Sequence, residues 1–368
     1  MTDFWTTLPR PIIGLSPMDG VTDHPFRHIQ KRYGNPDLIF TEFVRVERLC
    51  AGEVKLLRML LYDESQRPIV AQVYGTTPDA FRATAVLLCR LGFDGIDINM
   101  GCPSSSVAEN GAGAGLIRTP ALAAEIIAAT RAGVRDWQNG ATARDVPDVA
   151  PAVAELVEQQ HRQLPLIFQQ RRAIPVSVKT RIGYTKSQVD EWVSHLLECT
   201  PAAISLHGRT LTQAYGGRAD WNAIGRAVEL ARGSGTLILG NGDVADRADG
   251  LARAAAYGVD GVLMGRASHG NPFVFCADAG VHRDADFRIR YPLLAIAHEH
   301  AAIFEESLSG WPGYSFHLMH KHLRWYVRSV PGARGLRREL LDTRTAADVR
   351  RVLDAYFTSR AHWEGTLA

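Results

Sequence analysis

The sequence predicts an α/β protein in which a (β/α)8 TIM barrel is followed by a small all-α helical bundle. Eight short apolar runs, most of them followed by a helix-like segment, alternate over about 270 residues, which matches the size of such a barrel. A doubly wound sheet also alternates strands and helices. The number of runs and the polar residues at their carboxyl ends favour the barrel, whose active sites are built at those ends.

The expected strands are short and apolar, as is typical of strands that are buried on both faces. They cover residues 12–18, 37–43, 69–74, 95–99, 175–180, 203–207, 236–240 and 261–264.

Residues that favour helix ends mark the helices between these strands. Thr77 and Pro78 suit the first positions of a helix, and its apolar run stops at Gly92. A second helix is expected over residues 121–132, and we expect Gly133 to end it.

Two segments depart from the alternation. Residues 133–174 separate a helix from the next strand by about 40 residues, where a short loop is usual. A connection of this kind lies at the face of a barrel opposite its active site, so we expect a structural or contact insertion there. No strand signal follows residue 283, which divides the chain into a barrel, residues 1–283, and a helical domain, residues 284–368.

The helical domain is expected to contain helices over residues 292–309, 315–330, 334–341 and 345–356. The second of these is amphipathic, because apolar residues recur at helical spacing on one face. Its other face carries His317, Lys321, Arg324 and Arg328. Such a stripe is most often a solvated surface, but residues 321–338 contain six lysines and arginines and no acidic residue, which favours binding of a polyanion.

Composition narrows the class of protein. Hydrophobic residues make up 46% of the chain, which suffices for a core, and the net charge of +2 limits any nucleic-acid contact to a local basic patch. The five cysteines are scattered without a Cys-x-x-Cys pair, so we expect neither a disulfide framework nor a metal site. No secretory signal and no apolar run of about 18 residues is evident. We therefore expect a cytoplasmic protein without membrane contact or an obligatory protein partner.

Polar groups at the strand ends are expected to form one ring. A single such residue usually caps a turn or makes a buried hydrogen bond, but seven groups in one ring are hard to explain in this way. They are Ser16-Pro17-Met18, Gln72, Asn99 with Cys102, Lys179 with Arg181, His207, Asn241-Gly242-Asp243 and Gly265-Arg266.

The turns after the last two strands suit a phosphate group. Gly242 and Gly265 free backbone N–H groups, and Arg266 adds a guanidinium. A short segment near residues 271–275 follows, as in the usual phosphate site of this fold. A mononucleotide cofactor or substrate is therefore predicted.

Cys102 and Lys179 each leave two interpretations open. Cys102 lies before Pro103 at a strand end, so it is either a reactive thiol or a small buried hydrophobic residue. Lys179 occupies an inward strand position, where a salt bridge with Glu42 or Asp97 would offset the cost of burial. Alternatively, Lys179 stabilises negative charge on a bound cofactor.

Several motifs spread over nearly the whole chain together resemble those of the bacterial tRNA-dihydrouridine synthases. They cover residues 16–23, 99–103, 176–181, 207–210, 241–243 and 265–266, and residues 321–326 and 331–334 resemble that family's helical domain. The resemblance implies an FMN-dependent enzyme that reduces a uridine in the D-loop of tRNA to 5,6-dihydrouridine, with NADPH as the reductant.

The resemblance also assigns roles to residues. Cys102 would donate a proton and Asn99 would contact the uracil. Residues 41–46 are similar to the subfamily acting near position 16 of the tRNA, so Arg45 would orient it, while Lys321 and Arg324 would contact its backbone. The residues that would hold FMN are Ser16, Pro17, Met18, Gln72, Lys179, His207, Asn241, Gly242, Asp243, Gly265 and Arg266.

Three departures and two alternatives qualify this assignment. Residues 104–106 are serines where the family commonly has a lysine, the insertion at 133–174 has no counterpart in the motifs, and parts of the helical domain resemble another subfamily. The modified uridine therefore stays open at this point.

A flavin barrel that acts on a free small pyrimidine or enone explains the barrel but not the basic helical domain. An RNA-binding module with a decayed active site conflicts with the complete ring of strand-end residues.

Overall fold

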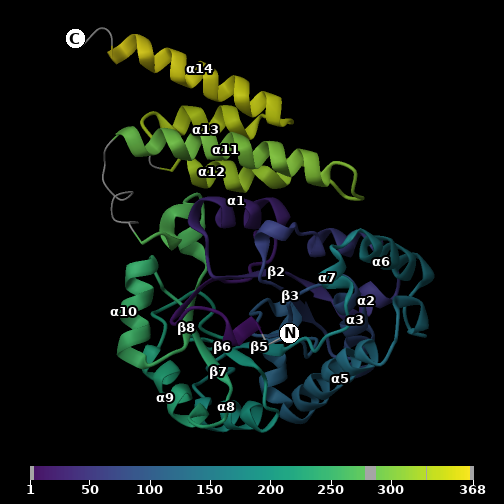
Figure 1. The fold of residues 1–368 in the computed structure, drawn as a ribbon. Coiled ribbons are helices and arrows are strands. Elements are labelled where there is room, and N and C mark those ends of the chain that lie inside the picture. Colours follow the sequence, from purple (N-terminus) through teal and green to yellow (C-terminus); the bar gives the residue numbers. More distant parts are fainter. Residues whose placement is uncertain (1–3, 278–286, 329, 365–368) are drawn as a thin grey trace.

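The computed structural model describes residues 4–277, 287–328 and 330–364. Eight parallel strands close into a barrel in sequence order, and helices surround it (Figure 1). The predicted (β/α)8 fold is therefore confirmed. The strands are β1 Ile12–Leu15, β2 Leu38–Arg45, β3 Ile69–Tyr74, β4 Gly95–Met100, β5 Val176–Arg181, β6 Ala203–His207, β7 Leu237–Asn241 and β8 Gly261–Met264.

Two strands differ from their expected bounds by more than one residue at an end. β1 ends at Leu15, and the next residues, which were expected to extend it, turn away as the wall of a cavity. Pro17 has no N–H with which to continue the ladder. β2 runs on to Arg45, and its pairing with β3 shifts register between Phe40 and Phe43.

The helices around the barrel are α1 His24–Gly34, α2 Val46–Cys50, α3 Pro78–Arg90, α4 Ser105–Ala108, α5 Pro120–Gln138, α6 Pro151–Gln163, α7 Leu166–Gln169, α8 Val189–Glu198, α9 Trp221–Ala231 and α10 Arg247–Tyr257. The expectation that α5 ends at Gly133 is wrong, because the helix continues to Gln138. A Cβ on Gly133 would lie 2.1 Å from the Arg82 carbonyl oxygen of α3. This glycine allows two helices to approach and does not cap one.

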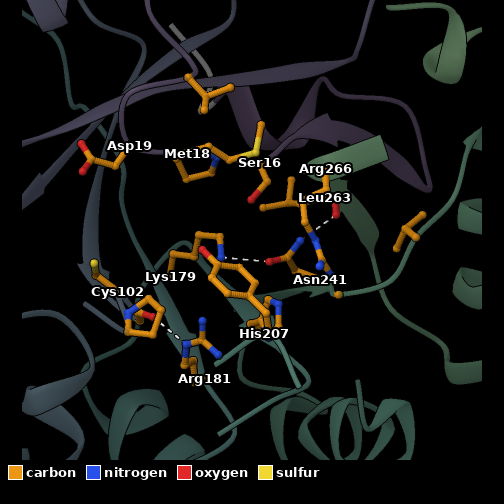
Figure 2. Close-up of a pocket in the computed structure, with 18 of the residues that line it drawn as sticks. Ser16, Met18, Asp19, Cys102, Lys179, Arg181, His207, Asn241, Leu263 and Arg266 are labelled. Carbon is orange, nitrogen blue, oxygen red and sulfur yellow. Dashed lines mark hydrogen bonds between the residues drawn. The ribbon is translucent and has the colours of Figure 1, made fainter. Parts of the chain in front are cut away.

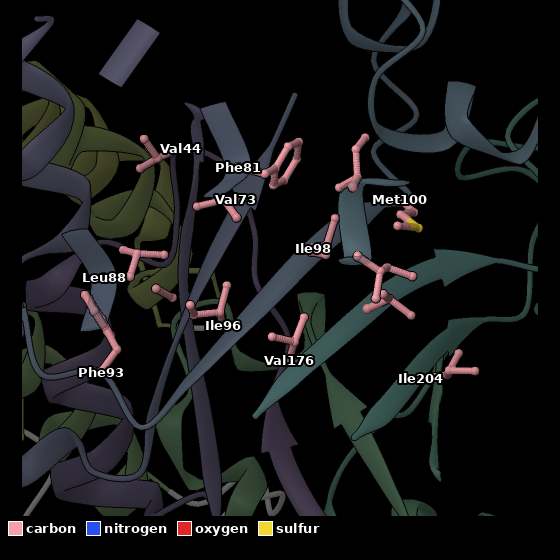
Figure 3. Close-up of a cluster of buried hydrophobic side chains, with 14 of the residues drawn as sticks. Val44, Val73, Phe81, Leu88, Phe93, Ile96, Ile98, Met100, Val176 and Ile204 are labelled. Atoms are coloured by element: carbon pink, nitrogen blue, oxygen red, sulfur yellow. The ribbon is translucent and has the colours of Figure 1, made fainter. Parts of the chain in front are cut away.

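The barrel core lies between the strands and the helix layer. Figure 3 shows apolar side chains from β2, β3 and β4 beside those of α3, such as Val73 and Ile98 near Phe81. All three side chains are buried. Each contributes about 1.5–3 kcal/mol by leaving water, so the apolar runs that identified the strands also hold the helices in place.

The insertion packs along the outside of the barrel. Its helix α6 begins beside α2, where the Ala150 N–H donates to the Cys50 carbonyl at 2.9 Å. The helix ends near the carboxyl end of α3, where His161 Nδ1 lies 2.7 Å from the Arg90 carbonyl oxygen. The insertion therefore covers the side of α3. The expected position, on the face opposite the active site, describes only part of it.

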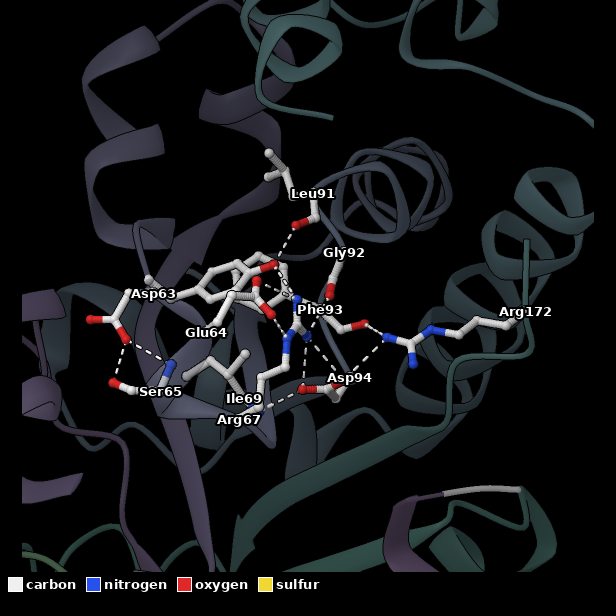
Figure 4. A network of polar contacts seen from close by, with 11 residues as sticks. Asp63, Glu64, Ser65, Arg67, Ile69, Leu91, Gly92, Phe93, Asp94 and Arg172 are labelled. Carbon is white, nitrogen blue, oxygen red and sulfur yellow. Dashed lines mark hydrogen bonds and ion pairs between the residues drawn. The ribbon is translucent and has the colours of Figure 1, made fainter. Parts of the chain in front are cut away.

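A network of polar contacts fixes the next part of the insertion to the barrel (Figure 4). Asp94, which lies just before β4, accepts hydrogen bonds from Arg67 and Arg172 at 3.0 and 3.1 Å. The Arg67 guanidinium also lies 3.3 Å from the ring centre of Phe168 in α7. Residues from the insertion thus share one buried carboxylate with the start of the barrel wall.

Four helices follow the barrel and stack on α1 (Figure 1). They are α11 Phe287–Leu308, α12 His320–Tyr326, α13 Ala333–Leu341 and α14 Ala346–Glu364, and the 3-10 helix η8 Phe316–Met319 precedes α12. The expected single helix over 315–330 is therefore divided into η8 and α12. Their apolar face packs on α1 through a second core that includes Ile29, Phe304 and Leu323. The expected boundary at residues 283 and 284 lies outside the described residues.

None of the helices in the described ranges is both long and apolar enough to cross a membrane.

Candidate active site

A cavity of about 650 Å³ opens at the carboxyl ends of the barrel strands (Figure 2). Its lining includes every residue predicted to hold the cofactor, together with Asn99 and Cys102. These residues are Ser16, Pro17, Met18, Gln72, Asn99, Cys102, Lys179, His207, Asn241, Gly242, Asp243, Gly265 and Arg266. Parallel strands bring their carboxyl ends to one face, which explains how residues so distant in sequence meet.

Lys179 lies in the middle of this cavity. Its Nζ donates to Asn241 Oδ1 at 3.0 Å, and the Asn241 amide donates in turn to the Leu263 carbonyl at 2.8 Å. Burial, together with the charge of Arg181, lowers the pKa of Lys179 to about 8. Within the described residues Lys179 forms no ion pair, so the salt bridge, one of the two interpretations left open, is not formed. The ammonium faces the cavity, and the charge of Asp97 acts on it without a direct contact.

Asp97 is occupied elsewhere. Its carboxylate accepts from Gln72 Nε2 at 2.7 Å and from the Ser177 hydroxyl at 2.6 Å. Burial raises the pKa of Asp97 to about 6. The acid therefore orients Gln72 and leaves the charge of Lys179 available to an anionic group in the cavity.

His207 is held as a neutral imidazole. Burial and the neighbouring charges of Lys179 and Arg181 lower the pKa of His207 well below its ordinary value. The Arg209 backbone N–H donates to His207 Nδ1 at 3.2 Å. Nδ1 is thus the acceptor, which places the proton on Nε2 as a hydrogen-bond donor.

The turns after β7 and β8 form a cradle for a phosphate. In the described part of the chain, the backbone N–H groups of Gly242, Asp243, Gly265 and Arg266 have no acceptor. Gly242 has a φ of +121°, and a Cβ there would lie 2.7 Å from that of Ala219. Only glycine fits this turn, and the free N–H groups suit an anion.

Asp243 positions the arginines of the cradle. It accepts from Arg209 Nη2 at 2.7 Å, from Arg266 Nη2 at 3.1 Å and from the Ala219 N–H at 2.8 Å. Burial raises the pKa of Asp243, but the Ala219 N–H and the Arg209 guanidinium outweigh it, and the pKa is lowered. A charged carboxylate thus holds Arg266 at the edge of the cavity.

The segment expected to complete the phosphate site lies elsewhere. The 3-10 helix η7 Pro272–Phe275 packs against α1, where a Cβ on Gly34 would lie 2.1 Å from the Pro272 carbonyl oxygen. Instead, the 3-10 helix η6 Arg266–Ser268 follows β8 directly and lines the cavity.

Cys102 lies on one side of the cavity and Arg266 on the other (Figure 2), and Asn99 lines the same cavity. Asn99 Oδ1 accepts from the backbone N–H groups of Gly101 and Cys102 at 3.0 and 2.9 Å. Its Nδ2 donates to Gln72 Oε1 at 3.0 Å, which leaves one amide hydrogen free. Burial raises the pKa of the Cys102 thiol, so it carries its proton at neutral pH.

Sequence reasoning gave no role to several residues that line the cavity. Phe43, Tyr215 and His269 reach it from separate loops and strand ends, and nothing in their local sequence marks them. Asp19 lies within the motif at residues 16–23 but was given no role of its own, and Arg181 was placed at a strand end without a role. Arg181 donates to the Gly101 carbonyl at 2.7 Å and thus supports the turn before Cys102.

Apart from Asn99, the residues predicted to contact tRNA lie outside the cavity. Arg45 pairs with Glu47 at 3.0 Å, just beyond the end of β2. Lys321 lies close to the barrel, because a Cβ on Gly20 would be 3.6 Å from its Nζ. Arg324 is exposed on α12. Their contact with a nucleic acid stays a prediction.

Comparisons with known proteins extend over nearly the whole chain. The family model "Dihydrouridine synthase (Dus)" matches residues 14–138 and 150–361, and the gap lies inside the insertion. The chain is 35% identical over 362 residues to "Probable tRNA-dihydrouridine synthase" of Staphylococcus aureus (strain COL), covering 96% of this chain and 95% of that protein. It is 34% identical over 359 residues to "Probable tRNA-dihydrouridine synthase 2" of Bacillus subtilis (strain 168), covering 96% of each.

Proposed function

The chain belongs to the dihydrouridine synthase family, and we propose that it reduces a D-loop uridine of tRNA to 5,6-dihydrouridine with bound FMN and NADPH. One observation carries the proposal. A phosphate cradle, a buried lysine and a protonated thiol line a single cavity at the carboxyl ends of the barrel strands.

The cavity suits a flavin mononucleotide. The free N–H groups around Gly242 and Gly265, together with Arg266, match a single terminal phosphate. Lys179 and the neutral His207 offer hydrogen-bond donors to the carbonyl groups of the ring system. When bound and reduced by NADPH, FMN would supply a hydride to C6 of the uracil.

Cys102 acts as the proton donor. The C5=C6 bond of uracil is conjugated to a carbonyl, so negative charge builds at C5 and a proton is needed there. The raised pKa keeps a proton on Cys102 Sγ, which gives it to C5 as a general acid. In this reaction the cysteine is an acid and not a nucleophile.

Asn99 places the uracil for this transfer. Its Oδ1 is committed to the backbone of Gly101 and Cys102, so the free hydrogen on Nδ2 is the group that can bind a uracil oxygen. Gln72, which is itself fixed by Asp97, keeps that amide in one orientation. The same side chain thus sets the position of both the base and the thiol.

The tRNA backbone binds along the basic face of η8 and α12. His317, Arg324 and Arg328 are exposed there, and Lys321 points toward the barrel. Extruding a base costs a few kcal/mol, and contacts between phosphates and these side chains offset that cost. Arg45, held by Glu47 at the end of β2, orients the D-loop near position 16.

Mapping of tRNA from a deletion strain tests the proposal. We expect dihydrouridine to disappear from one or more D-loop positions, to return with the wild-type gene, and not to return with Cys102→Ala. The purified protein should be yellow and should release FMN on denaturation. An unchanged dihydrouridine content, or reduction of free uracil in place of tRNA, would contradict the assignment.

A further inference from the structure

Three polar side chains meet where the helical domain packs on the barrel, outside the cavity described above. Asp23 precedes α1, His300 lies in α11 and His322 lies in α12. One nitrogen of each histidine and one oxygen of the carboxylate lie within 4.8 Å of one another. Three atoms at such spacing all lie within about 2.8 Å of a common point, and small side-chain shifts shorten that distance to the metal–ligand distances of about 2.0–2.2 Å.

The nitrogen atoms of this cluster lack partners. His300 Nε2 and both ring nitrogens of His322 are buried and have no hydrogen-bond partner within the described residues. The two side chains are at most 1% exposed. Buried polar atoms are nearly always satisfied, so three unpartnered nitrogens in one place indicate that something binds there.

The surrounding contacts orient the ligands. His300 Nδ1 lies 3.2 Å from the Tyr326 hydroxyl, which leaves Nε2 as the free nitrogen. Metal-binding histidines are usually held in this way through their other nitrogen. Asp23 Oδ1 caps α1 by accepting from the Phe26 N–H at 3.0 Å, and the second carboxylate oxygen is available.

Charged groups of both signs surround the cluster. Arg27, Lys321 and Arg58 interact electrostatically with Asp23, and Glu42 is a further acidic group that interacts with it. The Arg27 guanidinium is already committed to Gln66 Oε1 at 3.0 Å and to two carbonyl groups. Asp23 is therefore the one ligand of the three that brings negative charge to a cation.

We propose that Asp23, His300 and His322 bind one divalent transition-metal ion of the zinc class. Two imidazoles and a carboxylate are the ligand types that such ions prefer, while Mg²⁺ and Ca²⁺ take oxygen ligands. The fourth position is taken by water. Because the three ligands come from α1, α11 and α12, the metal fixes the helical domain to the barrel and holds Lys321 beside the rim of the active site.

The first test uses the purified wild-type protein with its flavin. After removal of metals by a chelating resin, added Zn²⁺ should bind at about one equivalent and raise the melting temperature by several degrees, since a ligand that binds only the folded state stabilises it. Co²⁺ should give visible absorption bands of a protein site. Binding well below one equivalent, with an unchanged melting temperature and no Co²⁺ bands, overturns the proposal.

Single substitutions locate the site. Asp23→Asn keeps an oxygen to cap α1, and His300→Gln and His322→Gln keep a polar side chain of similar length. Each should reduce the Zn²⁺ stoichiometry at least tenfold. His320→Gln is the matched control, because His320 is also buried on α12 but bonds to the Thr343 carbonyl outside the cluster. Equal loss in the control, or full binding in all three variants, contradicts the assignment. If a variant fails to fold, the titration of the wild-type protein decides.

Discussion

At the scale of single residues, the site works through side chains whose charge is set by burial. Lys179 faces the cavity without a carboxylate, His207 is neutral, and Cys102 keeps its proton. Asp97 lies behind them and fixes Gln72, which fixes Asn99. The acid–base role of each group follows from its surroundings more than from its residue type.

Replacing the proposed acid tests its role most directly. Cys102→Ala should lower dihydrouridine formation by about 10²–10⁴, the usual contribution of a positioned general acid. FMN content and bleaching by NADPH should stay unchanged, because Cys102 lies across the cavity from the phosphate cradle. Cys199→Ala, at the end of α8, is the control and should retain full activity. Full activity of Cys102→Ala on tRNA would rule out this role.

The pH profile provides a second check on the same thiol. A general acid works only while protonated, so the rate falls as the pH rises through its pKa. Burial raises the pKa of the Cys102 thiol above its ordinary value, so the part of the alkaline decline that depends on Cys102 should lie at a higher pH than for an exposed thiol. Single-turnover reduction of tRNA measured against pH would show it. Because the pKa of Lys179 is about 8, the residual rate of Cys102→Ala is measured over the same range, and an alkaline decline that is the same in both proteins would contradict the assignment.

The site was largely predictable at this scale because strand ends are recognisable in the sequence. The residues expected to hold FMN all line one cavity. The sequence left open whether Lys179 forms a salt bridge, because hydrogen-bond partners depend on side-chain directions, and in the structure Asp97 turns toward Gln72 and Ser177. Tyr215 and His269 carry no local signal, since a loop residue reaches the cavity only through the path of its loop.

At the scale of elements, glycine has two distinct uses that the sequence does not distinguish. Gly133 lies in the middle of α5 and lets α3 approach, whereas Gly335 in α13 has open space around its Cβ position. A glycine before a polar stretch resembles a helix end, which explains the error in the predicted end of α5. Only the neighbouring helix shows why the residue is small.

This contrast gives a paired stability experiment. Gly133→Ala places a Cβ 2.1 Å from the Arg82 carbonyl oxygen and should destabilise the protein by about 1–3 kcal/mol, the usual cost of overpacking. Gly335→Ala meets nothing within 4 Å and should stabilise α13 by about 0.5–1 kcal/mol. Urea denaturation measures both. Equal effects of the two substitutions would show that close packing of α3 and α5 does not matter.

At the scale of the whole molecule, the helical domain extends the barrel beside its active site. Ile29 of α1 is buried in the core of the helical domain, while the loop just before α1 lines the cavity. α12 presents Lys321 to the barrel and Arg324 to solvent. One helix thus joins the proposed catalytic and RNA-binding surfaces.

Charge reversal on this helix separates binding from chemistry. Lys321→Glu and Arg324→Glu should raise the apparent KM for tRNA and weaken its salt dependence, because each lost phosphate contact reduces the number of released counterions. NADPH oxidation without tRNA should stay unchanged. Arg351→Glu, an exposed residue of α14, is the control. Unchanged tRNA kinetics in both variants would exclude this face as the binding surface.

The sequence by itself determined the order of strands, the barrel and the set of residues at its strand ends, because short apolar runs and their polar ends are local patterns. It also indicated the family through motifs that keep their spacing. The tertiary structure alone decided which side chains are partners, why Gly133 is small, and that Asp23, His300 and His322 meet. Those facts depend on contacts between residues far apart in the chain, and local patterns do not record such contacts.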